Sequence, residues 1–318
     1  MGRIDVATKR FVSISDIFAQ LFNVGLFQGD IVVCEDGLTD MNSLEDIRLE
    51  KHIDRQVFER TRDVKKLSDL GFALAILGIE DQEAVHYYMP VRAMMYDAAS
   101  YETQYKQIIE DYEKKGIAIP YGTGAPKGTK VMPVITIIFY TGKKPWDGPR
   151  DLFELLKIPD ESKHIMQKYM NNYHIHVIDA RHMTDEEINQ YSGDLKAFFI
   201  MLRDYYDEEM LRGVIARHRE TWYAVSIIKG DKRYQEYIES VDEQTLTGGI
   251  DMCETLDYIE KRGIEKGIEK GIEKGIGHGE ERISELNVRL IEAGRMDDVL
   301  KAAKDKDYRK KLLEEYGL

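Results

Sequence analysis

Short apolar runs separated by polar turns dominate the first half of the chain. The run Phe72 to Ile79 is almost wholly apolar and is followed directly by Glu80. Its short length favours a buried strand over a helix. Val131 to Tyr140 is rich in β-branched and aromatic residues, which is typical of a central strand. The pattern also predicts strands at residues 31–34, 56–67 and 174–178.

Helical periodicity begins close to the N-terminus. Between Ser13 and Val24, four apolar residues fall on one face of a helix. Ser15 or Asp16 stands where a side chain commonly caps the first turn. We therefore predict the first helix of the protein in this segment.

Further helices are predicted between and after the strands. Pro90 fits the first turn of a helix that follows Glu80, because its missing N–H costs little there. A short helix is predicted at residues 151–156, and a continuous one from the capping box at Thr184 to about residue 229. Strands that alternate with helices predict an α/β fold, with a mixed sheet flanked by helices.

The chain length allows one large domain with an appendage. We predict that residues 1–245 form the main domain and that residues 246–318 form a helical tail. The tail contains a Gly-Ile-Glu-Lys repeat that begins at Gly263, Gly267 and Gly271, and degenerately at Gly275. The repeat places isoleucines four residues apart, so a helix would carry them as a slanting stripe.

The repeat has two interpretations. Each glycine costs a helix about 1 kcal/mol relative to alanine, so an isolated helix is marginal. Burial of the isoleucines against a second helix would offset that cost, which favours a homo-oligomer formed through residues 262–277. The alternative is a flexible linker hinged at its glycines.

The composition is that of a globular, acidic protein. Hydrophobic residues make up 43% of the chain, charged residues 32%, and the formal net charge is −13. The sequence has no run of eighteen apolar residues and no hydrophobic signal core, so we expect a cytoplasmic protein without a membrane partner. The two cysteines, Cys34 and Cys253, stand in no metal-ligand spacing.

The negative charge also restricts any function on nucleic acid. Neutralisation of phosphates supplies most non-specific affinity for DNA, so this chain needs a local basic patch to bind it. Arg60, Arg62, Lys65 and Lys66 provide such a patch around Asp63.

Asp63 and Glu80 are the candidate catalytic residues. If the predicted strands that contain Asp63 and precede Glu80 form a hairpin, both carboxylates lie at one end of the sheet. A carboxylate there is costly to desolvate unless it is protonated, paired or bound to a metal. Two carboxylates and a backbone carbonyl suit Mg²⁺ or Mn²⁺. The alternative is that Asp63 pairs with Arg62 or Lys66 and that Glu80 only begins a turn.

The same residues resemble a known family. Asp63, the gap of seventeen positions, the apolar strand and the sequence Glu80-Asp81-Gln82 are similar to the Rpn family of recombination-promoting nucleases. These proteins are also called YhgA-like putative transposases and belong to the PD-(D/E)XK superfamily. The following segment, Tyr88-Met89-Pro90-Val91-Arg92 with Tyr96-Asp97 and Tyr101, adds to the resemblance. It spans roughly residues 11–206 and is weaker outside the core stretch.

The resemblance implies a restriction-endonuclease-like αβββαβ core and a divalent-metal-dependent DNA endonuclease of recombination or transposition. Asp63, Glu80 and the carbonyl of Asp81 would bind Mg²⁺ or Mn²⁺, and Gln82 would orient the attacking water or the phosphate. Gln82 stands where the wider superfamily has Lys. Because an amide is neutral, it cannot stabilise developing charge as Lys does, and we expect slow turnover.

Two other residues and one other function remain open. Arg92 is a candidate phosphate contact, with a salt bridge to Glu80 or Asp97 as the alternative. Asp16 is a helix cap or, as in relatives of this fold, an acidic group that approaches the metal. Gln82 and the net charge also favour a different class, a non-catalytic oligomerising or DNA-binding protein that retains a nuclease-like scaffold.

Overall fold

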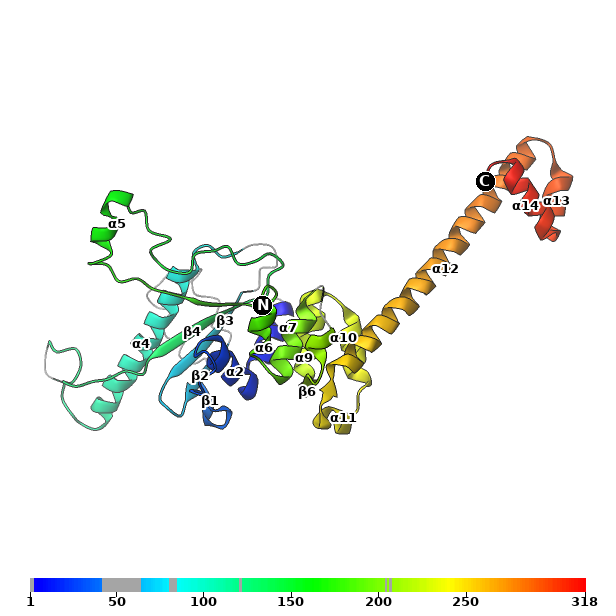
Figure 1. Ribbon diagram of the computed structural model, residues 1–318. Helices are drawn as coiled ribbons and strands as arrows, with labels where there is room; N and C mark the ends of the chain where they lie inside the picture. Colours follow the sequence, from blue (N-terminus) through cyan, green and yellow to red (C-terminus); the bar gives the residue numbers. More distant parts are fainter. Residues whose placement is uncertain (1–2, 42–63, 80–84, 120–121, 204, 206–207) are drawn as a thin grey trace. The chain divides into compact units, whose positions relative to one another are not determined.

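The computed structural model describes residues 3–41, 64–79, 85–119, 122–203, 205 and 208–318. Contacts divide the chain into two compact units, Met1–Thr255 and Leu256–Leu318. The first unit contains a five-stranded sheet with helices packed on it, and the second unit is helical (Figure 1). The predicted α/β architecture with a mixed sheet and a helical C-terminal region is therefore confirmed.

The sheet is mixed, because the strand pairs in one half are antiparallel and those in the other half are parallel. From one edge to the other it contains β1 (Leu38–Asp40), β2 (Val64–Ser68), β3 (Ala73–Ile79), β4 (Val134–Tyr140) and β5 (His176–Asp179). The β1–β2 and β2–β3 pairs are antiparallel, whereas the β3–β4 and β4–β5 pairs are parallel. The predicted strands at residues 72–80, 131–140 and 174–178 correspond to β3, β4 and β5. Of the strand predicted at residues 56–67, the described part belongs to β2.

The predicted strand at residues 31–34 is wrong. In α2 (Ser15–Gly25), the Asn23 side-chain oxygen accepts the N–H groups of Val32 and Val33, at 3.0 and 2.8 Å. Its amide nitrogen donates to the Val33 carbonyl at 2.8 Å. Because a helix side chain satisfies these backbone groups, the segment does not pair with the sheet. The edge strand β1 forms a few residues later, after η1 (Glu35–Gly37).

Side chains that alternate along β4 face two helical layers. Ile138 and Tyr140 form a buried cluster with residues of α4 (Met89–Lys114). Phe139, on the opposite face, lies 6.0 Å from the Phe198 ring of α7 (Gly193–Leu202). Phe198 in turn stacks on Phe11 of α1 (Arg3–Val12) at 4.3 Å. The sheet is thus covered by α4 on one face and by α1 and α7 on the other.

The segment predicted as one helix from Thr184 to about residue 229 is broken into several elements. The capping box at Thr184 is confirmed, and it starts the short helix α6 (Asp185–Asn189). After α7 come α8 (Glu208–Leu211), the strand β6 (Ile215–Ala216) and α9 (Arg219–Lys229). Strand β6 pairs with β7 (Ile250–Asp251). The middle of this segment therefore forms a strand that pairs with a distant part of the chain and is not helical.

The short helix predicted at residues 151–156 is also wrong. Asp151 forms an isolated bridge with His174, and Leu152 donates its N–H to the Tyr173 carbonyl at 3.0 Å. The backbone is therefore tied to the chain that precedes β5. The next helix is α5 (Asp160–Met166).

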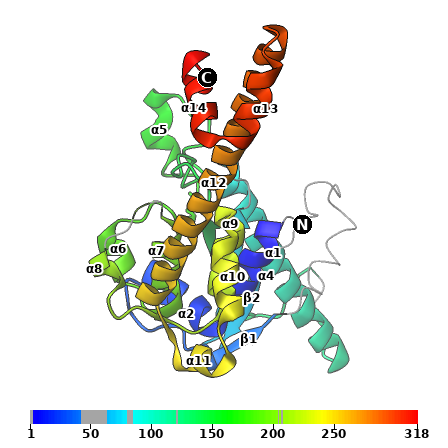
Figure 2. The ribbon, with the colours of Figure 1, turned by 90° about the vertical axis from the view of Figure 1, so that its right-hand side faces the viewer.

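The remaining elements are helices. In the first unit, α10 (Lys232–Ser240) lies beside α9 and precedes α11 (Glu243–Gly248), as Figure 2 shows. The second unit is built from most of α12 (Met252–Glu292), α13 (Met296–Lys304) and α14 (Lys306–Glu315), whose core contains Leu286, Leu290, Ala302 and Leu312.

Asp305 separates α13 from α14. The Asp305 side chain accepts the N–H groups of Asp307 and Tyr308 and so caps a new helix. Among the described residues, no helix is both long and apolar enough to cross a membrane.

Candidate functional site

Six of the residues predicted for the catalytic site or the basic patch lie outside the described residues. They are Arg60, Arg62, Asp63, Glu80, Asp81 and Gln82. The strands next to them in the sequence are described, and these strands define one end of the sheet. Lys65, Lys66 and Arg92 are described in full.

The described strands that adjoin the predicted carboxylates share one end of the sheet. Strand β2 begins at Val64 and β3 ends at Ile79, and the two are antiparallel neighbours. Strands β3, β4 and β5 are parallel and in register, with Ile79 opposite Tyr140 and Tyr140 opposite Asp179. The start of β2 and the ends of three parallel strands therefore meet at this end, which we call the carboxyl end of the sheet. Ligands of α/β proteins commonly bind at such an end.

Lys65 and Lys66 point to opposite sides of β2, because residues alternate in a strand. Lys66 is only 4% exposed. Its ammonium pairs with Asp40 at 2.7 Å and lies 5.7 Å from the Phe18 ring centroid. The Lys66 charge is thus engaged inside the fold in this structure, whereas Lys65 is partly exposed.

Arg92 lies one turn before Tyr96 on α4 and contacts it. The Arg92 guanidinium is 5.6 Å from the Tyr96 ring centroid, and one of its nitrogens donates to the Tyr96 hydroxyl at 3.4 Å. The neighbouring Asp97 is buried and accepts hydrogen bonds from the Thr136 and Tyr173 hydroxyls. These contacts orient Asp97 towards the sheet.

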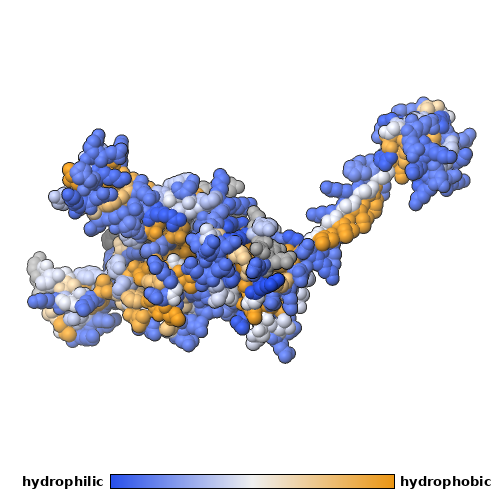
Figure 3. Space-filling model, in the orientation of Figure 1, coloured by the Kyte–Doolittle hydropathy of each residue, from blue (hydrophilic) through white to orange (hydrophobic). Residues whose placement is uncertain are grey.

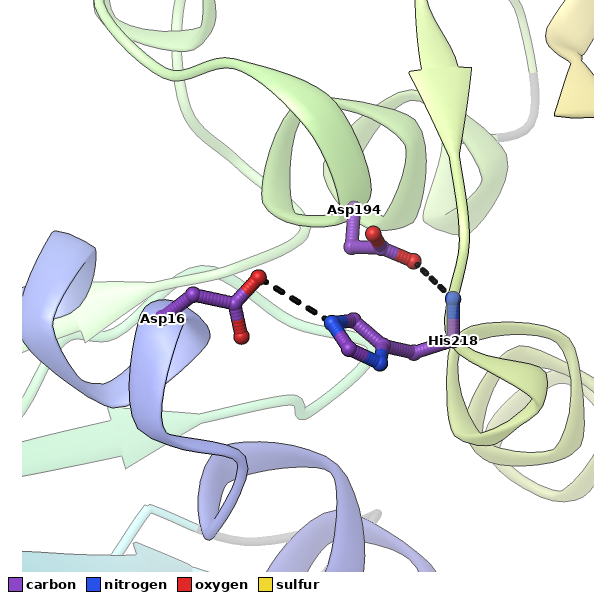
Figure 4. A group of neighbouring side chains, drawn as sticks. All are labelled: Asp16, Asp194 and His218. Atoms are coloured by element: carbon purple, nitrogen blue, oxygen red, sulfur yellow. Dashed lines mark hydrogen bonds and ion pairs between the residues drawn. The ribbon is translucent and has the colours of Figure 1, made fainter. Parts of the chain in front are cut away.

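A cluster of Asp16, Asp194 and His218 forms a second candidate site in the described chain (Figure 4). Its residues come from the first turns of α2 and α7 and from the residue before α9. The His218 Nε2 and the Asp16 carboxylate are 3.0 Å apart, and a hollow of about 180 Å³ adjoins them. Of the three residues, only Asp16 was a candidate from the sequence, because 202 positions separate it from its histidine partner.

Asp16 and His218 shift each other's pKa. The hydrogen bond to Asp16 raises the pKa of His218 above its ordinary value, although burial acts in the opposite direction. Burial raises the pKa of Asp16, but the hydrogen bond and charge of His218 and nearby N–H groups outweigh it, so this pKa is lowered. Each shift favours the charged form, so the two side chains form an ion pair at pH values between the ordinary pKa of aspartate and that of histidine.

The hydrogen bonds of Asp194 indicate the structural role of the cluster. Its carboxylate accepts the N–H groups of Arg217 and His218 and the Thr221 hydroxyl, the last at 2.6 Å. The three possible ligand atoms lie within 4.8 Å of one another, as a metal site requires. However, protein donors already occupy the Asp194 oxygens, and His218 is bound to Asp16. The observed role is therefore a clamp that joins α2, α7 and α9.

The predicted capping role of Asp16 needs a correction. The N-cap of α2 is Ile14, and no side chain caps it. Asp16 lies in the first turn, where its Oδ1 accepts the Ile17 N–H at 2.8 Å. Its Oδ2 faces the Nε2 of His218.

Part of the chain matches the model of a known protein family. A family model described as YhgA-like putative transposase matches residues 75–221, which extend from β3 into α9. The matched stretch includes Glu80, Asp81 and Gln82 and begins after Asp63. Searches of the curated proteins and of the solved structures found no match. Residues 75–221 of this chain belong to the YhgA-like putative transposase family.

Proposed function

We propose that this protein is a divalent-metal-dependent DNA endonuclease that acts in recombination- or transposition-related DNA processing. One observation carries the proposal: Asp63 directly precedes β2 and Glu80 directly follows β3, and these ends of the two strands share the carboxyl end of the sheet. The family match, which indicates a transposition- or recombination-related role and DNA as the partner, supports it independently.

The order of elements supports a PD-(D/E)XK core. A helical layer precedes three antiparallel strands, β1 to β3, and α4 then leads to β4, parallel to β3. This order agrees with the αβββαβ arrangement implied by the sequence resemblance. We place the proposed core within residues 1–245, followed by the tail at residues 246–318.

The donor set of the proposed site suits a hard cation. The carboxylates of Asp63 and Glu80 and the carbonyl of Asp81 offer oxygen atoms only, which Mg²⁺ and Mn²⁺ prefer. When bound, such an ion would supply a Lewis acid that lowers the pKa of water and screens phosphate charge. Gln82 would hold the water or the phosphate by hydrogen bonds.

The test is cleavage of supercoiled plasmid in Mg²⁺ or Mn²⁺. We expect slow nicking or linearisation by the wild type and none by Asp63→Ala or Glu80→Ala. Asp69→Ala is the matched control, because this exposed aspartate lies in the turn at the opposite end of the β2–β3 hairpin. Gln82→Lys should raise the rate, since a cation beside the phosphate adds transition-state stabilisation.

Wild-type cleavage by both Asp63→Ala and Glu80→Ala would show that the site lies elsewhere. A wild type that binds plasmid but never cuts it would favour the second candidate function, a non-catalytic DNA-binding protein with a nuclease-like scaffold. The neutral Gln82 and the net charge of −13 are the observations in favour of that alternative.

We also propose that the protein associates with a second copy of itself through residues 262–277. In the structure, Ile264, Ile268, Ile272 and Ile276 are 57–59% exposed on α12. They form the apolar stripe visible along this helix in Figure 3. Apart from the adjacent residues and the nearby backbone of the same helix, no atom lies within 4 Å of a Cβ added at Gly267, Gly271 or Gly275, so a second backbone has room to approach.

A further inference from the structure

The exposed isoleucines of α12 lie between two flanks of different character. Successive residues of a helix are rotated by about 100°. Each isoleucine of the repeat therefore has the preceding glycine on one side and the following glutamate on the other. In Figure 3 a pale stripe runs beside the apolar one, in agreement with this order. We call the side with Gly267 and Gly271 the glycine flank and the side with Glu269 and Glu273 the acidic flank.

The two flanks differ in charge. Glu269 and Glu273 are exposed on the acidic flank, whereas Glu265 pairs with Arg262 of the same chain at 3.2 Å. The glycine flank offers no side chains of its own, and the exposed Lys274 lies beyond it around the helix. A second helix on the isoleucine stripe therefore meets a different charge pattern in each of its two possible directions.

Two-fold symmetry decides which flanks meet when a second copy packs on the stripe. In an antiparallel pair like flanks lie together, so Glu269 and Glu273 of one copy face the same residues of the other. In a parallel pair unlike flanks lie together, as the e and g positions of a parallel coiled coil do. The acidic flank of each copy then lies beside the glycine flank of the other, where Lys274 supplies the opposite charge. Because juxtaposed like charges disfavour association, the parallel pair is preferred.

The tail limits how far two copies can follow each other. Leu286 and Leu290 follow Ile268 and Ile272 by eighteen residues, which is five full turns of about 3.6 residues. They therefore point to the same side of α12, about 27 Å further along. That side is covered there, because both leucines are buried against residues of α13 and α14. A coiled coil along the whole of α12 would place the second copy in the same space.

A four-residue repeat favours a crossing instead. Side chains four residues apart form ridges, and two helices that pack through such ridges cross at about 50°. If the axes cross between Ile268 and Ile272, they are roughly 23 Å apart where Leu286 and Leu290 lie. The glycine flank lets the two backbones approach closely at the crossing. The crossing thus buries the stripe and leaves space for α13 and α14.

We infer that a second copy binds parallel to the first and crosses it between Ile264 and Ile276. The inference deepens the proposed association through residues 262–277 and rests on it. The isoleucines of the two copies meet at the crossing, and each acidic flank lies beside the glycine flank of the other copy. The stripe is therefore specific for α12 of the same protein in one direction.

The test of direction is cross-linking of full-length protein with a short bismaleimide. Cys34→Ser and Cys253→Ser remove the native thiols, and either Ile264→Cys or Ile276→Cys adds one. In a parallel pair each position lies near its own counterpart, so each variant alone should form a covalent dimer. In an antiparallel pair Ile264 lies near Ile276 of the other copy. Cross-linking only in a co-expressed mixture of the two variants would therefore overturn the inference.

Lys270→Cys in the same background is the matched control, because Lys270 is exposed on the side of α12 opposite to the stripe. It should give no covalent dimer. Equal cross-linking of all three variants would also overturn the inference, since collisions in solution do not depend on the stripe.

Charge removal gives a second measurement, the dimer Kd from sedimentation at low salt. Glu269→Gln combined with Glu273→Gln should raise the Kd about twofold, because the attraction to Lys274 is lost. An antiparallel pair would instead become tighter, since two repelling flanks are neutralised. Glu292→Gln combined with Glu314→Gln removes two exposed charges outside the flanks and should leave the Kd unchanged. An unchanged or lower Kd in the flank variant contradicts the parallel arrangement.

Sedimentation of the wild type separates the two proposals. If the wild type is a monomer at every concentration, the association itself fails, and the stripe serves another partner or none. If the wild type is a dimer that cross-links only as the mixed pair, the association stands and the parallel arrangement alone fails.

Discussion

Asp194 illustrates how a single buried side chain organises the chain around it. It is 7% exposed and accepts backbone N–H groups from Arg217 and His218, where α9 begins. Hydrogen bonds to an ionised group are roughly twice as strong as those between neutral partners. The carboxylate thereby fixes the start of α9 and brings His218 to Asp16.

The ion pair between Asp16 and His218 should make stability depend on pH. The pKa of His218 is raised above 6.5, so its contribution is fully present below that pH and is lost as pH rises through the raised pKa. The pKa of Asp16 is lowered below 3.8, so its contribution is present above that pH and is lost as pH falls through the lowered pKa. Both contributions coexist in the window between these ordinary values.

We therefore predict that His218→Gln lowers the free energy of unfolding more at pH 5.5 than at pH 8.5. The loss at pH 5.5 should be about 0.5–1 kcal/mol, because both side chains are about a third or more exposed and solvent screens the pair. Urea denaturation at the two pH values measures it. His164→Gln, on the exposed surface of α5, is the control and should show no such difference. An equal loss at both pH values would mean that His218 acts through packing alone.

At the scale of elements, α12 is the one whose sequence conflicts most with its conformation. Its 41 residues are helical although the Gly-Ile-Glu-Lys repeat places a glycine at every fourth position from 263 to 275. Each glycine disfavours the helix by about 1 kcal/mol, and the exposed isoleucines contribute little within one chain. Packing of two copies would offset the glycine cost by burying the isoleucines.

Replacing both Ile268 and Ile272 by Ser should therefore convert an oligomer into a monomer. The molar mass from light scattering gives the result directly. The matched control replaces the exposed Lys270 and Lys274 by Ser and should keep the wild-type mass. A monomeric wild type would rule out the pairing. Gly271→Ala adds a second check, because it stabilises an isolated helix by about 1 kcal/mol but weakens association if backbones approach at the glycine.

At the scale of the whole molecule, the features discussed above are divided between the two units. The sheet and the clamp of Asp16 with Asp194 and His218 belong to the first unit, and the repeat belongs to the second. A ligand that binds the folded first unit should therefore stabilise that unit alone. The free-energy gain depends on the ratio of ligand concentration to Kd.

We predict that Mn²⁺ raises the melting temperature of the unit that contains the sheet. At a hundredfold excess over Kd the stabilisation is about 2.7 kcal/mol. Thermal melting of the full-length protein measures it, with Asp69→Ala expected to respond as the wild type does and Asp63→Ala expected to lose the shift. If Asp63→Ala keeps the shift and Asp16→Asn abolishes it, the metal binds at the clamp instead.

The sequence alone determined the elements whose stability is local. The apolar runs that become β3 and β4, the capping box at Thr184 and the proline in the first turn of α4 are found where the pattern predicts them. These features depend on residues within a few positions of one another, so a linear pattern contains enough information.

Only the tertiary structure decided the features that join distant parts of the chain. Valine is common in strands, yet the N–H groups of Val32 and Val33 donate to the Asn23 side chain and do not pair with the sheet. The clamp around His218 combines side chains from the first turns of α2 and α7 and from the residue before α9, which no local spacing reveals. Backbone polar groups and charged side chains pair with partners that are close in space, and these partners can be far apart in the sequence.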